Sequence, residues 1–129
     1  MKKDNFHEEY MLKAGSGRVI WDLISTPTGL ETWFADKVKL KDKKFTFTWG
    51  KTETREATII HIRANNFIRI HWDDDEENPR SYFELKMSYN ELTNDHTLEV
   101  TDTSTTDTQD ELKELWDSQI EKMCRVSGL

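Results

Sequence analysis

The sequence predicts an α+β fold in which a curved antiparallel sheet of six or seven strands wraps around a long C-terminal helix. Short runs that alternate apolar and polar residues fill most of residues 37–103, which is typical of antiparallel strands. One amphipathic stretch then closes the chain over residues 109–126. A sheet that grips a single helix can leave a cavity between the two, so a binding pocket is expected there.

The chain is expected to begin with a strand and a short helix. Residues 6–13 alternate and are rich in aromatic side chains, which indicates a strand. Ser16 is a suitable N-cap for a helix over residues 18–24. Pro27 then ends this helix, because proline disfavours the helical conformation in the residue before it.

A second short helix is predicted directly after the first. Thr28 and Glu31 have the spacing of a capping box, in which two side chains satisfy free backbone N–H groups at a helix start. This helix would carry Leu30, Trp33 and Phe34. The tandem of two short helices between the first strand and the remaining strands is a distinctive feature of the predicted fold.

Alternation and turn residues predict six further strands, and Asn65-Asn66 predicts a tight hairpin turn between two of them. With a two-residue turn, Ile59 would lie opposite Trp72 and His61 opposite Ile70 on one inward face. The six strands are predicted at residues 38–40, 45–49, 57–64, 67–73, 82–92 and 96–103.

The closing helix has the clearest signals in the chain. Thr108 and Glu111 form a second capping-box match, and Gly128 is placed to end the helix. Apolar side chains recur at spacings of three and four, which places them on one face. That face is predicted to comprise Leu112, Leu115, Trp116, Gln119, Ile120 and Met123.

Composition excludes some classes of partner. The chain has 129 residues, which fits one domain, and a net charge of −7, which argues against nucleic acid as a partner. The basic run over residues 37–44 alternates with other residues and is interpreted as the solvent face of an edge strand, with a patch for an anion or an acidic partner as the alternative. The acidic run 73–77 lacks the glycine and terminal glutamate of a calcium loop.

The sequence contains a single cysteine, Cys124, so an internal disulfide is excluded and a cytoplasmic location is expected. No apolar run has the length of a membrane span. No phosphate loop, nucleophile elbow or paired metal-ligand spacing is present, so no catalytic residue, metal or cofactor is expected. His61 is interpreted as a pocket-wall residue, with acid or base catalysis as the weaker alternative.

Large aromatic residues on several predicted elements suggest a cavity wall, although plain core filling would give the same pattern. The candidate ligand-binding residues are Tyr10, Trp33, Phe47, Trp49, Ile59, His61, Trp72, Phe83, Leu85, Met87, Trp116 and Ile120.

Two segments carry a resemblance to a known family. Residues 16–34 (SGRVIWDLISTPTGLETWF) resemble the first helices of the START-like superfamily, also called SRPBCC or the helix-grip fold, with one residue inserted before Trp21. Residues 114–123 (ELWDSQIEKM) resemble its closing helix. The chain is most similar to the branch named after the activator of the heat-shock-protein-90 ATPase. The resemblance spans nearly the whole chain, so residues 1–129 are expected to form a single START-like domain.

The resemblance implies several functions and transfers no catalytic residue. Such proteins bind apolar or amphipathic small molecules, act on them as cyclases or hydrolases, or regulate chaperones. We expect a non-enzymatic domain that binds a small hydrophobic molecule. The alternative is a protein-interaction module, either a homodimer or a chaperone regulator, which would use the outer sheet face around Ile60, Ile62 and Phe67. An enzyme that uses His61 is the weakest expectation.

Overall fold

A computed structural model describes residues 6–12, 17–103 and 108–128 and has the predicted α+β class. The predicted strand end at Lys13 and the predicted helix cap Ser16 fall outside these ranges. Within them, the helices are α1 (Gly17–Ser25), α2 (Pro27–Leu30) and α3 (Gln109–Ser127). The strands of the same ranges are β1 (Phe6–Leu12), β2 (Lys37–Lys41), β3 (Lys44–Trp49), β4 (Glu53–Arg63), β5 (Phe67–Trp72), β6 (Phe83–Asn90) and β7 (Asp95–Asp102).

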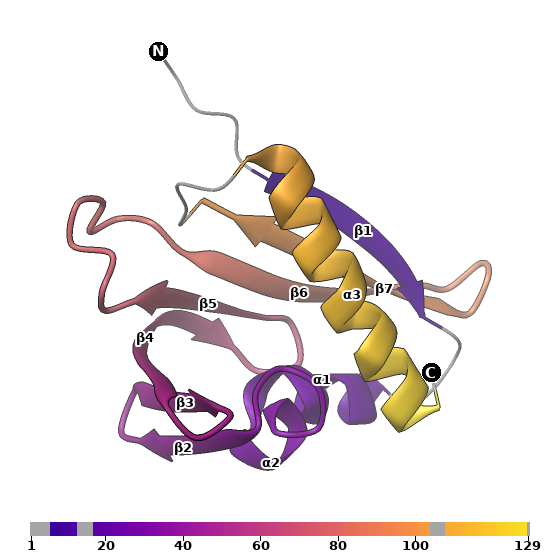
Figure 1. Cartoon of the computed structure of the whole chain (residues 1–129). Helices are drawn as coiled ribbons and strands as arrows, with labels where there is room; N and C mark the ends of the chain where they lie inside the picture. Colours follow the sequence, from indigo (N-terminus) through magenta and orange to yellow (C-terminus); the bar gives the residue numbers. More distant parts are fainter. Residues whose placement is uncertain (1–5, 13–16, 104–107, 129) are drawn as a thin grey trace.

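The strands form one curved antiparallel sheet in the order β1-β7-β6-β5-β4-β3-β2. The first two strands of the chain therefore lie at opposite edges, and α1 and α2 carry the chain from one edge to the other. Figure 1 shows α3 lying diagonally across one face of the sheet, with α2 beside β2 and α1 next to α2. This is the predicted arrangement of a sheet around a long final helix.

Alternation along the strands places the core between the sheet and α3. On β7 every second side chain is buried, and Leu98 and Val100 have no exposed surface. On β5, Ile68, Ile70 and Trp72 point inward in the same way. Burial of these rows against the helices is the main favourable contribution to folding.

The ends of α3 follow the predicted signals. The Thr108 hydroxyl accepts a hydrogen bond from the Glu111 N–H at 3.2 Å, and Gly128 has the left-handed φ of 77° that favours glycine after a helix. The buried stripe comprises Leu112, Trp116, Ile120 and Met123. Among the described helices, none is long and apolar enough to cross a lipid bilayer.

The predicted cap of α2 is wrong by two residues. Thr26, not Thr28, is the N-cap, and its hydroxyl accepts a hydrogen bond from the Gly29 N–H at 3.0 Å. Pro27 occupies the first helical position, where its missing N–H costs nothing because that group would be free anyway. Glu31 follows the helix as its C-cap and therefore does not complete a capping box.

The predicted register of the β4–β5 hairpin is also wrong. Ile59 lies opposite Ile70, whereas the prediction placed it opposite Trp72. The connecting turn has three residues, because Arg63 pairs with Phe67 across residues 64–66. The extra turn residue shifts every pair along the hairpin.

His61 was predicted to face inward, and it is exposed on the outer face. A β-bulge between Ile59 and His61 adds one residue to β4, so that His61 pairs with Arg69. Its ring contacts Phe67 edge to face, with centroids 4.7 Å apart. The bulge depends on pairing between two strands, so the alternation within β4 alone does not predict it.

Candidate functional site

An aromatic cluster occupies the space between the sheet and α3 near the middle of the fold. Phe34, which follows α2, lies at its centre, and its ring centroid is 4.9 to 6.3 Å from six other rings. Two of these rings stack on Phe34, two meet it edge to face, and two are tilted; stacking and edge-to-face contact are the favourable geometries for aromatic pairs. The six are Trp33, Phe47, Trp49, Trp72, Phe83 and Trp116.

A pocket of about 380 Å³ opens beside this cluster, between the inner face of β3 to β5 and α3. Its volume lies in the range of pockets that hold small molecules. The walls are mostly apolar, and three polar side chains interrupt them. The lining residues are Phe34, Trp49, Glu53, Arg55, Trp72, Leu115 and Gln119.

Hydrogen bonds fix two tryptophans, Trp49 in the pocket wall and Trp116 behind it. The indole N–H of Trp49 donates to the Phe34 carbonyl oxygen at 2.9 Å, which joins two wall residues. Deeper in the core, the Trp116 indole N–H donates to Asp102 Oδ2 at 3.1 Å. Because a buried N–H needs a partner, these bonds select one orientation of each ring. The wall is therefore organised before any ligand enters.

Arg55 closes one side of the pocket. Its guanidinium lies 3.9 Å from the centre of the Trp72 ring, which is a cation–π contact. Two hydrogen bonds of 2.8 and 2.7 Å link the same guanidinium to the Asp74 carboxylate. These bonds raise the pKa of Arg55 and hold the pKa of Asp74 below its usual value, although burial opposes both changes. Both groups stay charged near neutral pH.

Gln119 brings a polar group from α3 into the lining. Its Oε1 atom is buried and has no hydrogen-bond partner within the described part of the chain. Leu115 lies one turn earlier on the same side of α3 and is 46% exposed. The predicted apolar stripe of α3 therefore divides into a buried row and a row that faces the pocket.

The predicted ligand residues fall into four groups. Trp49 and Trp72 line the pocket, His61 lies on the outer face, and Tyr10 and Met87 are partly buried elsewhere. Tyr10 donates a hydrogen bond to Asp117 Oδ1 at 2.6 Å, which ties β1 to α3. The remaining predicted residues are buried core: Trp33, Phe47, Ile59, Phe83, Leu85, Trp116 and Ile120.

Five lining residues were not among the candidates. Leu115 and Gln119 were predicted to lie on the apolar face of the closing helix, and this helical spacing could have identified them as pocket residues. Glu53 and Arg55 share the inward phase of β4 with Ala57, but the predicted strand began at Ala57 and did not include them. The fifth is Phe34.

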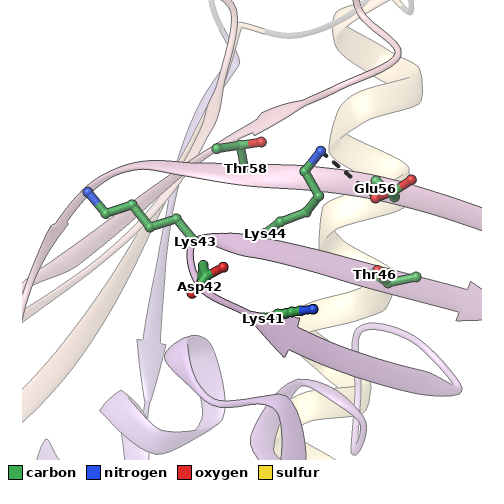
Figure 2. A pocket seen from close by; sticks show the side chains of 7 residues that line it. All are labelled: Lys41, Asp42, Lys43, Lys44, Thr46, Glu56 and Thr58. Carbon is green, nitrogen blue, oxygen red and sulfur yellow. Dashed lines mark ion pairs between the residues drawn. The ribbon is translucent and has the colours of Figure 1, made fainter.

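A second hollow of about 460 Å³ lies on the outer face of the sheet at the β2–β3 turn (Figure 2). Lys44 Nζ lies 2.8 Å from Asp73 and 3.9 Å from Glu56, so nearby carboxylates already compensate its charge. Figure 2 shows Lys43 extending away from Lys44. Although this hollow is larger, charged and hydroxyl side chains line it, and no aromatic ring is among its lining residues. The lining residues are Lys41, Asp42, Lys43, Lys44, Thr46, Glu56 and Thr58.

One group of potential metal ligands occurs in the described residues. The nearest donor atoms of His7, Glu9 and Glu99 lie within 4.8 Å of one another on β1 and β7. Spacing along the chain does not reveal this group, because its members come from two strands. His7 and Glu9 are exposed, and Lys86 pairs with Glu99 in the sheet. The group is better explained as a solvated surface cluster than as a metal site.

Comparisons with known proteins agree with the architecture. A family model described as a START-like superfamily domain matches residues 1–129. The solution structure of BfR322 from Bacteroides fragilis is 61% identical, with a TM-score of 0.71 over 100% of this chain and 94% of that one. No curated protein matches the sequence.

Two further solved structures are similar in fold alone. The Aha1 dimer from Colwellia psychrerythraea is 11% identical, with a TM-score of 0.71 over 95% of this chain and 92% of that one. The AHSA1-like protein from Aeromonas hydrophila is 12% identical, with a TM-score of 0.75 over 95% of this chain and 91% of that one.

Proposed function

Because the chain belongs to the START-like superfamily, we propose that it binds a small hydrophobic or amphipathic molecule in the pocket between the sheet and α3. The observation that carries this proposal is the pocket of about 380 Å³ beside the aromatic cluster. Its wall joins aromatic rings to a few polar groups, which is the usual composition of small-molecule sites.

The wall residues have distinct roles in this proposal. Trp49, Trp72 and Phe34 provide flat apolar surface, and Leu115 covers the ligand from the helix side. The buried candidates behind them, such as Phe47 and Trp116, hold the wall in place without touching the ligand. Because the rings are held by their neighbours and by hydrogen bonds, binding loses little conformational entropy.

No catalytic role is proposed. The acid or base considered in the sequence was His61, and this side chain is exposed on the outer face of β4. A ligand in the inner pocket would have the sheet between itself and that ring. A general acid or base must lie within hydrogen-bond reach of the proton that it moves. The proposal is therefore a binding domain.

A neutral fluorescent probe, N-phenyl-1-naphthylamine, tests the proposal. Leu115→Gln should weaken binding of the probe about fivefold, because it removes roughly 1 kcal/mol of apolar contact at the pocket. Val126→Gln is the matched control on the same helix, since Val126 is 50% exposed and is not a lining residue of the pocket. Equal affinities of the two variants, or no saturable binding by the native chain, would contradict the proposal.

A surface for a second copy of the chain or for a chaperone is the second candidate. Ile60 and Ile62 are 49% and 46% exposed, and they line a shallow hollow of about 210 Å³ with Lys43, Ile59 and His61. Exposed apolar residues that gather on one strand favour a protein contact. The fold is also similar to that of a protein solved as a dimer. If the native chain sediments as a monomer at every concentration, and Ile60→Lys does not change its sedimentation, self-association through this surface is excluded.

A further inference from the structure

Gln119, a lining residue of the inner pocket, carries a buried hydrogen-bond acceptor, Oε1, that has no partner within the described residues. A buried polar atom without a partner costs about 1–3 kcal/mol, and native proteins retain few of them. An acceptor held in this state favours a ligand that brings a donor.

The charges around the pocket sum to a negative value. Arg55 bonds to Asp74 through Nε and Nη2, so its positive charge is compensated. Glu53 also lines the pocket, and its carboxylate helps to raise the pKa of Arg55. One guanidinium therefore faces two carboxylates. This balance disfavours an anionic ligand and tolerates an uncharged or cationic one.

The shape of the wall restricts the apolar part of the ligand. Phe34, Trp49 and Trp72 present rings whose centroids lie 6.0 to 6.3 Å apart. Aromatic pairs prefer offset stacking or edge-to-face contact. A flat conjugated ring can make these contacts with more than one wall residue, whereas a flexible alkyl chain gains only from burial.

We propose that the pocket selects a flat aromatic molecule, uncharged or cationic, whose hydrogen-bond donor is accepted by Gln119 Oε1. This inference rests on the proposed function and specifies the chemical class of the ligand. The terminal torsion of a glutamine side chain is soft, so the amide can rotate toward a ligand without a shift of α3. Leu115 is half exposed and can move aside as the ligand enters.

Three naphthalene derivatives test the class of ligand by calorimetric titration. 2-Naphthol carries a donor, 2-methoxynaphthalene has the same ring without a donor, and 2-naphthoate is anionic. We expect 2-naphthol to bind tightest and 2-naphthoate weakest. Tightest binding of 2-naphthoate, or a native chain that prefers 2-methoxynaphthalene, would overturn the inference.

The Gln119→Met variant assigns the preference to one side chain. The ratio of the 2-naphthol and 2-methoxynaphthalene affinities should fall about tenfold, which corresponds to roughly 1.4 kcal/mol for one hydrogen bond. Comparing ratios cancels the different hydrophobicity of the two probes. Gln109→Met is the matched control, because Gln109 is also on α3 and is not a lining residue of the pocket.

Each outcome separates this inference from the proposed function. An unchanged ratio in Gln119→Met would overturn the inference, while probe binding that still depends on Leu115 would leave the proposed function standing. Absence of saturable binding by every probe would remove both. If Gln119→Met fails to fold, Gln119→Glu replaces it: this variant keeps an acceptor, so its ratio should be at least that of the native chain. A lower ratio would overturn the inference.

Discussion

At the scale of single residues, contacts between distant positions determine the shape of the pocket. Phe34 follows a short helix, yet its ring lies at the centre of the cluster and its carbonyl accepts the Trp49 indole N–H. Gln119 lies at an apolar spacing on α3, yet it supplies a polar group. Neither role follows from neighbouring residues, because both depend on which element packs opposite. The sequence pattern placed Gln119 on the apolar face of the closing helix and Phe34 on the second short helix, and it did not predict what either side chain meets.

Gly29 gives the sharpest prediction at this scale. A Cβ added at Gly29 would lie 2.0 Å from the Asp22 carbonyl oxygen, and this backbone atom of α1 cannot move aside cheaply. Gly29→Ala should therefore lower the free energy of unfolding by about 3 kcal/mol or more. Gly50→Ala is the comparison. A Cβ at this position would meet open space, so the substitution should cost only the backbone strain of a φ of 62°, about 1 kcal/mol. If urea unfolding showed that both variants lose the same amount of unfolding free energy, the close approach of α1 and α2 would be contradicted.

At the scale of elements, local signals predicted most boundaries, and pairing between elements caused the errors. The cap and end of α3 are local, and the predicted cap and terminator of this helix are confirmed. The β4–β5 register depends on a three-residue turn and a bulge that form only when two strands pair. The α2 cap was misplaced because Pro27 was interpreted only as a helix terminator, although it also begins the next helix.

Two threonine substitutions test the corrected start of α2. Thr26→Ala removes the side chain that accepts the Gly29 N–H and should cost about 1 kcal/mol of unfolding free energy. Thr28→Ala removes an exposed side chain two residues later and should cost less than about 0.5 kcal/mol. Chemical unfolding of both variants checks the assignment. A larger loss of unfolding free energy from Thr28→Ala than from Thr26→Ala would show that Thr28 is the N-cap, as the capping-box pattern predicted.

The contact between β1 and α3 gives a pH-dependent prediction. The Tyr10 hydrogen bond, with help from Lys113, holds the pKa of Asp117 below its usual value. A lowered carboxyl pKa stabilises the fold above about pH 4, and this contribution is lost as the pH falls further. Tyr10→Phe should therefore cost about 1 kcal/mol at pH 7, a modest value because the Asp117 side chain is 43% exposed.

The same variant is informative at both ends of the pH range. The difference between Tyr10→Phe and the native chain should shrink as the pH falls below about 4. Burial is the larger cause, and the Asp117 hydrogen bond the next, of a raised pKa of Tyr10. The native chain should therefore also lose its extra stability over Tyr10→Phe as the pH rises above about 10. Urea unfolding across this range measures the difference. A constant difference from pH 3 to pH 7 would show that Asp117 does not depend on Tyr10.

At the scale of the whole molecule, the order of elements predicted the architecture better than it predicted the site. Strand, two short helices, six strands and a long helix allow few compact arrangements, so the grip of the sheet on α3 could be predicted. Whether the gap between them is filled depends on side-chain packing. Most candidate residues proved to be core, and the pocket lies beside them, at the ends of β3 and β5. Large aromatic residues in a sequence indicate a core and a pocket wall equally well.

Titration with N-phenyl-1-naphthylamine, followed through the indole N–H signals in NMR spectra, tests the central claim most directly. The chain has five tryptophans. Within the residues that the structure describes, only Trp49 and Trp72 among them line the inner pocket. Their signals should shift and saturate together, while Trp21 on α1 serves as the internal control and stays nearly unchanged. Shifts of Trp21 as large as those of Trp49 and Trp72, or no saturable shift of any indole signal, would contradict a ligand pocket between the sheet and α3.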